Sequence, residues 1–218
     1  MKALAVIPVY NEVEYVESVL NGVRRHVSDI LVVDDGSDDG TERILDRLED
    51  IKVLRHPENL GYGRSLIDAF DYALRGDYEV VITLDADDQH EPDYIPRFLK
   101  ELSGVEIVSG SRYLEEVPGS SDPPPDRRRI NREVTRLLRR RYGLHITDAF
   151  CGFKAYRTCG LSCMRLTEDG YGMPLELWVQ AARLGGCRGC RFLVNTAGGG
   201  SLGSRLVSRA ALSARARE

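Results

Sequence analysis

The chain has 218 residues and a mass of 24.4 kDa, which is enough for one compact domain with its own hydrophobic core. Hydrophobic residues make up 42% and charged residues 29%, which excludes a disordered or fibrous chain. The longest apolar run, 3–10, is far shorter than the roughly 20 residues of a membrane-spanning helix, and no signal-peptide pattern is present. We therefore expect a cytoplasmic, folded protein that catalyses a reaction or binds a ligand.

The net charge of -4 is unevenly distributed along the chain. Residues 1–126 contain 12 Lys and Arg against 28 Asp and Glu, whereas residues 127–218 contain 18 against 6. An acidic half of this kind suits cations, and a basic half suits phosphates, although solvated surfaces also produce such a division.

Short apolar runs alternate with helical patterns over the first 110 residues. Five runs are short, rich in β-branched residues or leucine and bounded by turn residues, which predicts buried strands at Ala3–Val9, Ile30–Asp34, Ile51–Arg55, Val80–Leu84 and Val105–Ser109. Apolar residues at a spacing of three to four predict helices over 13–23, 44–48 and 66–74. This alternation predicts a mainly parallel sheet with helices on both faces. Ligands should collect at the carboxyl ends of its strands.

The second half of the chain shows fewer regular patterns. Prolines and small polar residues predict a loop over 118–125, and a basic helix is predicted over 127–141. A second helix is predicted over 174–184 and a short strand over 191–194. After residue 196 the sequence is rich in Gly, Ser, Ala and Arg, and we expect little regular structure there.

The basic helix carries eight arginines and one apolar stripe, formed by Ile130, Val134, Leu137 and Leu138. Two interpretations stay open. The arginines attract anionic lipid head groups, or the stripe packs on the domain and the arginines are merely solvated. Nucleic-acid binding is not expected, because interleaved aromatic residues are absent apart from Tyr142.

Two aspartates follow the predicted strand 80–84. In an extended backbone Asp85 and Asp87 project from the same side, toward the edge where ligands bind. Such a pair suits a divalent cation that a substrate diphosphate also holds. The alternative is a polar turn that caps a helix beginning at Pro92.

Two other strand ends carry polar side chains. After strand 30–34, Asp35 is placed to accept hydrogen bonds from a ribose or a base, and the following helix start offers amides to an anion. After strand 3–9, Tyr10 is placed to flank a nucleobase and Glu12 to bind a sugar hydroxyl. In both cases the alternative is an ordinary turn with a helix cap.

Six motifs occur in order along the chain: IPVYNE, VVDDGSDDGT, ENLGYG, LDADDQHEP, GSRY and TDAFCGFKAYR. In this order they resemble the family 2 glycosyltransferases, in particular the dolichyl-phosphate mannose and glucose synthases, over about residues 2–184. The resemblance implies an α/β fold of the GT-A (Rossmann-like) type. It divides the chain into a GT-A domain at 1–186, with a nucleotide-binding part at 1–110 and an acceptor part at 111–186, and an atypical tail at 187–218.

The resemblance also implies the roles of individual residues. Contacts with the nucleotide-sugar are implied for Pro8, Tyr10, Glu12, Asp35 and Asp85. Binding of Mg²⁺ or Mn²⁺ is implied for Asp85, Asp87 and Gln89. The implied catalytic residues are Asp87 and Arg112. One arginine of 127–129, here taken as Arg129, is expected to meet a phosphate, and Asp148 is expected to shape the acceptor side.

The implied reaction moves a hexose, with inversion, from a UDP- or GDP-sugar to a polyprenyl phosphate. A lipid phosphate arrives ionised and needs no general base, whereas a hydroxyl acceptor needs a carboxylate from Asp88, Asp148 or Glu176. Another alternative is a nucleotide-sugar-binding protein without turnover, because the tail departs from the family pattern. The expected location is the cytoplasm, with a peripheral contact at the inner face of the membrane.

Overall fold

The computed structural model describes residues 1–87, 91–113, 124–185 and, for the backbone alone, 194–198. The strands in these segments are β1 (Ala3–Val9), β2 (Asp29–Asp34), β3 (Lys52–Arg55), β4 (Val80–Thr83), β5 (Ile107–Ser111), β6 (Lys154–Arg157) and β7 (Val194–Gly198). The helices are α1 (Val16–Arg24), α2 (Thr41–Leu45), α3 (Tyr62–Arg75), the 3-10 helix η1 (Pro92–Tyr94), α4 (Ile95–Glu101), α5 (Pro125–Tyr142), α6 (Thr158–Leu161) and α7 (Met173–Gly185).

The strands form a seven-stranded sheet in the order β3-β2-β1-β4-β6-β5-β7. Strands β1 to β4 are mutually parallel, and β7 is parallel to β5. Only β6 among the described strands runs the other way, antiparallel to both β4 and β5. The prediction of a mainly parallel α/β sheet is therefore confirmed.

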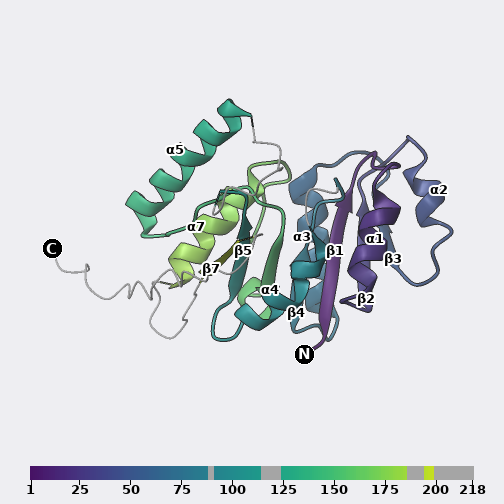
Figure 1. Cartoon of the computed structure of the whole chain (residues 1–218), viewed down its shortest axis with the longest axis horizontal. Coiled ribbons are helices and arrows are strands. Elements are labelled where there is room, and N and C mark those ends of the chain that lie inside the picture. Colours follow the sequence, from purple (N-terminus) through teal and green to yellow (C-terminus); the bar gives the residue numbers. More distant parts are fainter. Residues whose placement is uncertain (88–90, 114–123, 186–193, 199–218) are drawn as a thin grey trace.

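Helices cover both faces of the sheet. One core joins α1, α2 and α4 to one face, and a second core joins α3, α6 and α7 to the other. Successive residues of β4 belong to opposite cores. Ile82 lies in the first core with Leu20, and Val81 lies in the second core with Phe70 and Trp178. A strand that is buried on both faces is apolar throughout, which explains why its sequence is a continuous apolar run. Figure 1 shows α2 at one end of the molecule and α5, beside α7, at the other.

The first helix begins later than its periodicity predicts, at Val16 instead of Val13. The loop before it is held by the loop after β2, because the Glu12 and Val13 amides donate to Thr41 Oγ1 (3.0 Å) and Asp39 Oδ2 (3.1 Å). Asn11 has a φ of 58°, a left-handed conformation that asparagine tolerates better than most residues. The end of β1 is therefore a fixed loop and not a first helical turn.

Strand β6 was not predicted from the sequence. Its four residues, KAYR, begin and end with charged side chains, so they form no apolar run. Yet Lys154 and Tyr156 are buried, and the strand lies between β4 and β5 in the middle of the sheet. Because β6 is antiparallel, the chain segment before it lies at the edge where β4 and β5 end.

Helix α5 buries a different face from the predicted apolar stripe. Only Leu138 of the four stripe residues is fully buried, whereas Ile130 and Leu137 are 55% and 58% exposed. A polar residue completes the buried side: the Asn131 side chain donates to the Thr147 carbonyl (2.8 Å) and accepts from the Ala149 amide (2.9 Å). Of the two interpretations left open, packing of the whole stripe on the domain does not hold: Leu138 and Val134 pack in the second core, whereas the other two stripe residues are exposed. Among the described residues, no helix is both long enough and apolar enough to cross a bilayer.

The last described strand differs from the predicted one. Strand β7 spans Val194–Gly198 and pairs with β5, whereas the strand predicted over 191–194 overlaps it only at Val194. Regular structure therefore continues two residues beyond 196, contrary to expectation. Residues 191–193, 199–218 and most of the predicted loop 118–125 lie outside the described residues.

Candidate active site

The loops that carry the candidate site residues open at one edge of the sheet. Strands β1, β2, β4 and β5 run in the same direction and end there. The segment 146–153 reaches the same edge because it precedes the antiparallel strand β6. The topology therefore gathers the acidic loops of the first half and the GSRY and TDAFCGF motifs of the second.

The acidic side of this edge is built around Asp85. Its carboxylate accepts a hydrogen bond from the Tyr62 hydroxyl (3.2 Å), and burial raises the pKa of that hydroxyl, helped by the charge of Asp85. Gly152 lies directly against the carboxylate, because a Cβ atom there would overlap the Asp85 side chain. Tyr62 and Gly152 thus fix where the first aspartate of the pair points.

Glu12 belongs to the same acidic region. Partial burial raises its pKa, and the negative charges of Asp87, Asp39 and Asp85 raise it further. The loop after β1 and the loop after β4 therefore bring carboxylates within electrostatic reach of one another. Gln89, the third predicted metal ligand, lies outside the described residues.

The carboxylates fit a hard divalent cation that shares its coordination with a substrate. Among the described residues, no three His, Cys, Asp or Glu side chains form a group that could enclose a metal ion by themselves. Mg²⁺ is commonly held by one or two carboxylates together with substrate phosphates, and repulsion among acidic side chains favours a cation between them. Asp85 and Asp87 satisfy that requirement without a closed protein cage.

Asp35 is buried, and its carboxylate is fully engaged. It accepts hydrogen bonds from the Leu60 and Gly61 amides, both at 2.9 Å, and its Oδ1 lies 2.6 Å from His56 Nδ1. Gly61 has a φ of +108°, so this turn requires a residue without a side chain. Asp35 thus anchors the ENLGYG loop at the proposed nucleotide pocket.

His56 connects Asp35 to helix α3. Its other ring nitrogen, Nε2, lies 3.0 Å from Asp68 Oδ2, and the ring is buried. The two ring nitrogens therefore link the Asp35 and Asp68 carboxylates. No sequence motif singled out His56; only the fold shows it between two acids.

Replacing His56 by alanine is expected to lower the free energy of unfolding by roughly 3 kcal/mol or more, because two largely buried carboxylates lose their shared donor. Urea denaturation measures the loss. His26→Ala is the matched control, since His26 pairs with the exposed Asp93 (2.8 Å) and should matter much less. Equal losses in the two variants would contradict a structural role for the Asp35–His56–Asp68 contacts.

The basic side of the edge is formed by Arg112 and Asp148. The guanidinium donates from Nε to Oδ2 (2.8 Å) and from Nη2 to Oδ1 (3.0 Å), and the Arg112 amide also donates to Oδ2 (3.2 Å). Asp148 is fully buried, and this pairing raises the pKa of Arg112. The arginine is therefore permanently charged and held in one orientation, with a third of its side chain exposed.

Two other arginines approach this point from the start of α5. The positive charges of Arg128 and Arg127 lower the pKa of Tyr113, against a larger increase caused by burial and by Asp148. Tyr113 follows Arg112 directly, so these two arginines lie toward the same edge. Arg129 is exposed, and its predicted phosphate contact stays a prediction.

Two of the three carboxylates predicted as general-base candidates already accept hydrogen bonds from other residues of the protein. Asp148 is saturated by Arg112 and by the Phe150 amide (3.0 Å). Glu176 accepts hydrogen bonds from Thr167 and Glu168, which lower its pKa although partial burial acts in the opposite direction. The third candidate, Asp88, lies outside the described residues.

The remaining predicted residues lie at the end of β1. Pro8 is half-buried, and Tyr10 is 47% exposed at the edge, where a flat ligand could reach its ring. A buried lysine was not predicted: Lys154 of β6 donates to the Cys151 carbonyl and lies 5.8 Å from the centre of the Trp178 ring. Burial lowers its pKa, against the negative charges around it, Asp148 and Asp85 among them.

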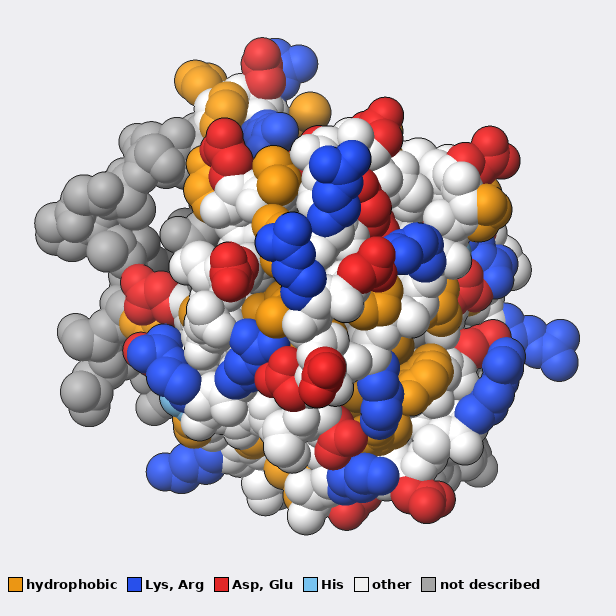
Figure 2. Space-filling model, turned by 90° about the vertical axis from the view of Figure 1, so that its right-hand side faces the viewer, with side chains coloured by type: hydrophobic (Ala, Val, Ile, Leu, Met, Phe, Trp, Pro, Cys, Tyr) orange, Lys and Arg blue, Asp and Glu red, His pale blue; other side chains and the backbone are white. Residues whose placement is uncertain are grey.

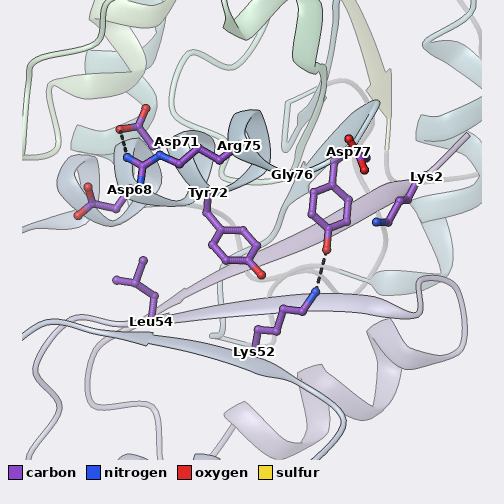
Figure 3. A pocket seen from close by; sticks show the side chains of 10 residues that line it. Lys2, Lys52, Leu54, Asp68, Asp71, Tyr72, Arg75, Gly76 and Asp77 are labelled. Carbon is purple, nitrogen blue, oxygen red and sulfur yellow. Dashed lines mark hydrogen bonds and ion pairs between the residues drawn. The ribbon is translucent and has the colours of Figure 1, made fainter.

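A pocket of about 610 Å³ lies away from this site, along α3 and the starts of β1 and β3. Lys52, labelled in Figure 3 among the side chains that line the pocket, donates to the Tyr78 hydroxyl (2.9 Å). That hydroxyl in turn donates to Asp29 (3.1 Å), and Lys2 lies 4.5 Å from the centre of the Tyr78 ring. Its two lysines therefore already have partners, and the pocket lies at the amino-terminal edge of the strands, where parallel α/β sheets rarely bind ligands.

Comparisons with known proteins identify relatives of this chain. The undecaprenyl-phosphate mannosyltransferase of Micrococcus luteus is 36% identical over 196 residues, covering 85% of this chain and 79% of that protein. The polyprenol monophosphomannose synthase of Mycolicibacterium smegmatis is 32% identical over 197 residues, covering 84% and 73%. Both names refer to mannose and to a polyprenyl carrier, as the resemblance of the motifs predicts.

The fold has solved counterparts. The glucosyl-3-phosphoglycerate synthase of Mycobacterium tuberculosis, solved with UDP, superposes with a TM-score of 0.67 at 21% identity, covering 94% of this chain and 73% of that one. This likeness confirms the GT-A fold. Residues 4–163 match the family described as glycosyl transferase family 2. The chain therefore belongs to family 2 of the glycosyltransferases and is a glycosyltransferase.

Proposed function

We propose that this enzyme transfers a hexose from a UDP- or GDP-sugar to a polyprenyl phosphate, with Mg²⁺ or Mn²⁺ at the donor diphosphate. One observation carries the proposal: the acidic loops after β1 and β4 and the Arg112–Asp148 pair lie at the same edge of the sheet. The names of the two relatives support the acceptor class. The related fold crystallised with Mn²⁺ and UDP-glucose supports the donor class and the metal.

In this proposal residues 1–110 bind the nucleotide and residues 111–186 meet the acceptor. Tyr10 flanks the base, Pro8 and Glu12 line the ribose side, and Asp35 holds the wall of the pocket. Asp85 and Asp87 hold the metal ion, which as a Lewis acid would reduce the charge on the departing diphosphate.

The sugar leaves the diphosphate through an oxocarbenium-like state, in which negative charge grows on the β-phosphate. Arg112 donates to that charge from the part of its guanidinium that Asp148 does not occupy. The Arg112 guanidinium is already oriented before the reaction, so its stabilisation of the leaving phosphate requires little reorganisation. An ionised lipid phosphate attacks without a general base, in keeping with the engaged Asp148 and Glu176.

A thermal-shift screen tests donor and metal together. UDP or GDP, and the matching sugar nucleotide, are expected to raise the melting temperature only when Mg²⁺ or Mn²⁺ is present, because ligands that bind the folded state stabilise it. Transfer of labelled hexose to undecaprenyl phosphate then tests the acceptor. Metal-dependent binding without transfer to any acceptor would favour a binding protein, and transfer to a hydroxyl alone would contradict the phosphate acceptor.

We also propose that the protein acts in the cytoplasm, at the inner face of the membrane, because its proposed acceptor is a membrane lipid. Nucleic acid is not part of the proposal.

A further inference from the structure

The loop 147–152 joins the basic and the acidic side of the site. Near its start Asp148 holds the Arg112 guanidinium, and at its end Gly152 lies against the Asp85 carboxylate. The loop belongs to no helix or strand, yet most of its residues are buried. Its buried carbonyls cannot reach water, so they need hydrogen-bond donors from elsewhere in the protein. These donors determine how the two sides of the site are placed relative to each other.

Four buried side chains, from four different elements, donate to the carbonyls of this loop. The pairs are Asn131 of α5 with Thr147 (2.8 Å), Trp178 of α7 with Ala149 (3.0 Å), Lys154 of β6 with Cys151, and Thr83 of β4 with Gly152 (2.6 Å). Asn131 and Trp178 thus hold the end of the loop that carries Asp148. Thr83 and Lys154 hold the end that lies against Asp85.

Thr83 and Lys154 are cross-strand partners in the middle of the sheet. They face each other in the antiparallel pairing of β4 with β6, so their side chains lie on the same face of the sheet. Val81 and Tyr156, two positions away on each strand, belong to the second core. Thr83 and Lys154 are only 1% and 3% exposed. A polar pair therefore interrupts an apolar layer, for which packing alone gives no reason.

The burial of Lys154 is unusual for a charged side chain. Figure 2 shows Lys and Arg side chains around α2 on the outside of the molecule, interspersed with Asp and Glu. Burial of an ammonium group is costly unless the group is hydrogen-bonded, and Lys154 donates to a carbonyl of the loop. Asp148 and Asp85 lie within electrostatic reach of it. Lys154 therefore contacts the loop close to both carboxylates whose positions the loop relates.

We propose that Thr83 and Lys154 are positioning residues of the active site, because they fix two successive carbonyls of the loop and so keep the Gly152 backbone against the Asp85 carboxylate. Neither side chain needs to touch the substrate for this role. The Tyr62 hydroxyl bonds to the same carboxylate from α3 (3.2 Å), so Asp85 is held from two directions. The consequence for metal binding rests on the proposed function, whereas the holding of the loop does not.

Thr83→Val keeps the shape of the side chain but leaves the Gly152 carbonyl without its donor. The Mn²⁺ concentration that gives half of the thermal stabilisation by UDP or GDP is expected to rise about 10-fold, because loss of a group that orients a metal ligand commonly weakens metal binding by about 10- to 100-fold. Thr83→Ser keeps the hydroxyl and should restore the value of the unmodified chain. Lys154→Met should act in the same direction as Thr83→Val.

Thr158→Val is the matched control. The Thr158 hydroxyl donates to the Tyr78 carbonyl (2.8 Å), which precedes β4 at the opposite edge of the sheet. This variant loses the same kind of hydrogen bond as Thr83→Val, so it should lower overall stability in a similar way. It should leave the Mn²⁺ requirement unchanged.

Alkylation of Cys151 tests the holding of the loop without any ligand. The thiol is 2% exposed, and burial raises its pKa to about 12, so it should react slowly with iodoacetamide while the loop stays in place. Peptide-resolved mass spectrometry should show Cys151 alkylated about 10-fold faster in Thr83→Val than in Thr158→Val, because the unsatisfied carbonyl favours local opening.

Equal alkylation of Cys151 in the two valine variants would overturn the proposal. So would an Mn²⁺ requirement that Thr83→Val leaves unchanged. If the unmodified chain showed no metal-dependent stabilisation, the proposed function would fail, and the alkylation rates would still decide whether Thr83 holds the loop.

Discussion

Asp87→Asn is expected to lower kcat for hexose transfer by about 100-fold or more, with little change in overall stability. Asparagine keeps the size of the side chain but removes the charge that would hold a divalent cation beside Asp85. Without the cation, the diphosphate leaves with its charge uncompensated, and such compensation contributes several kcal/mol to a transition state. Steady-state transfer rates over a range of Mn²⁺ concentrations, together with the metal-dependent thermal shift, measure both consequences.

Two further variants sharpen this test. Gly152→Ala leaves every acidic residue in place but pushes a methyl group into the Asp85 carboxylate, so it should mimic Asp87→Asn in both measurements. Asp77→Asn is the matched control, since Asp77 is exposed and lines the pocket at the opposite edge of the sheet. Metal-dependent stabilisation that survives in both Asp87→Asn and Gly152→Ala would exclude this pair as the metal site.

Much of the fold could be predicted from local sequence patterns. Strands such as β1 and β4 are buried on both faces, so each is a short and largely apolar run, and its length, β-branched residues and flanking turns favour a strand over a buried helix. Helix α3 buries Leu66, Ala69 and Phe70 at the spacing that predicts it. These elements are determined by burial, which a single sequence reflects directly.

Strand β6 could not be predicted in this way. Lys154 occupies a buried position because its ammonium group donates to the nearby Cys151 carbonyl and faces Trp178, which is distant in sequence. The same holds for Asn131, whose buried amide is satisfied by the loop 147–149. A polar residue whose partner is distant in sequence looks exposed until the partner is known.

The candidate site also contains residues that local sequence patterns predict and contacts that only the fold shows. Asp85 and Asp87 are close in sequence, so strand geometry predicts a common direction for them, but β4 ends at Thr83 and the chain bends at 86–87, so that direction stays a prediction. Arg112 and Asp148 are 36 residues apart, and only the antiparallel course of β6 brings them together. Gly152 could not be interpreted before the Asp85 carboxylate was located against it, although it stands inside a quoted motif. The motifs thus predicted which segments matter, and the topology determines how they combine.

Arg112→Lys is expected to lower kcat by about 100-fold, with a much smaller change in the KM for the donor. Lysine keeps the positive charge but cannot make the two parallel hydrogen bonds to Asp148, so its ammonium group is not held toward the departing phosphate. Removal of one oriented donor from a transition state commonly costs about 10²- to 10³-fold in rate. Transfer kinetics with saturating metal measure the effect.

The control for Arg112→Lys is Arg75→Lys, which makes the same exchange on the exposed side of α3, where Arg75 pairs with Asp71 at 3.5 Å. It should leave both kinetic constants unchanged. The kcat of Asp148→Asn should lie between those of Arg112→Lys and Arg75→Lys. The side-chain oxygen of the asparagine still accepts from the Phe150 amide and from one guanidinium N–H, but the ion pair is lost. If Arg112→Lys instead raised KM and left kcat intact, Arg112 would bind the ground state and the transition state equally, and the additional stabilisation of the leaving phosphate in the transition state would have to come from Arg127 or Arg128.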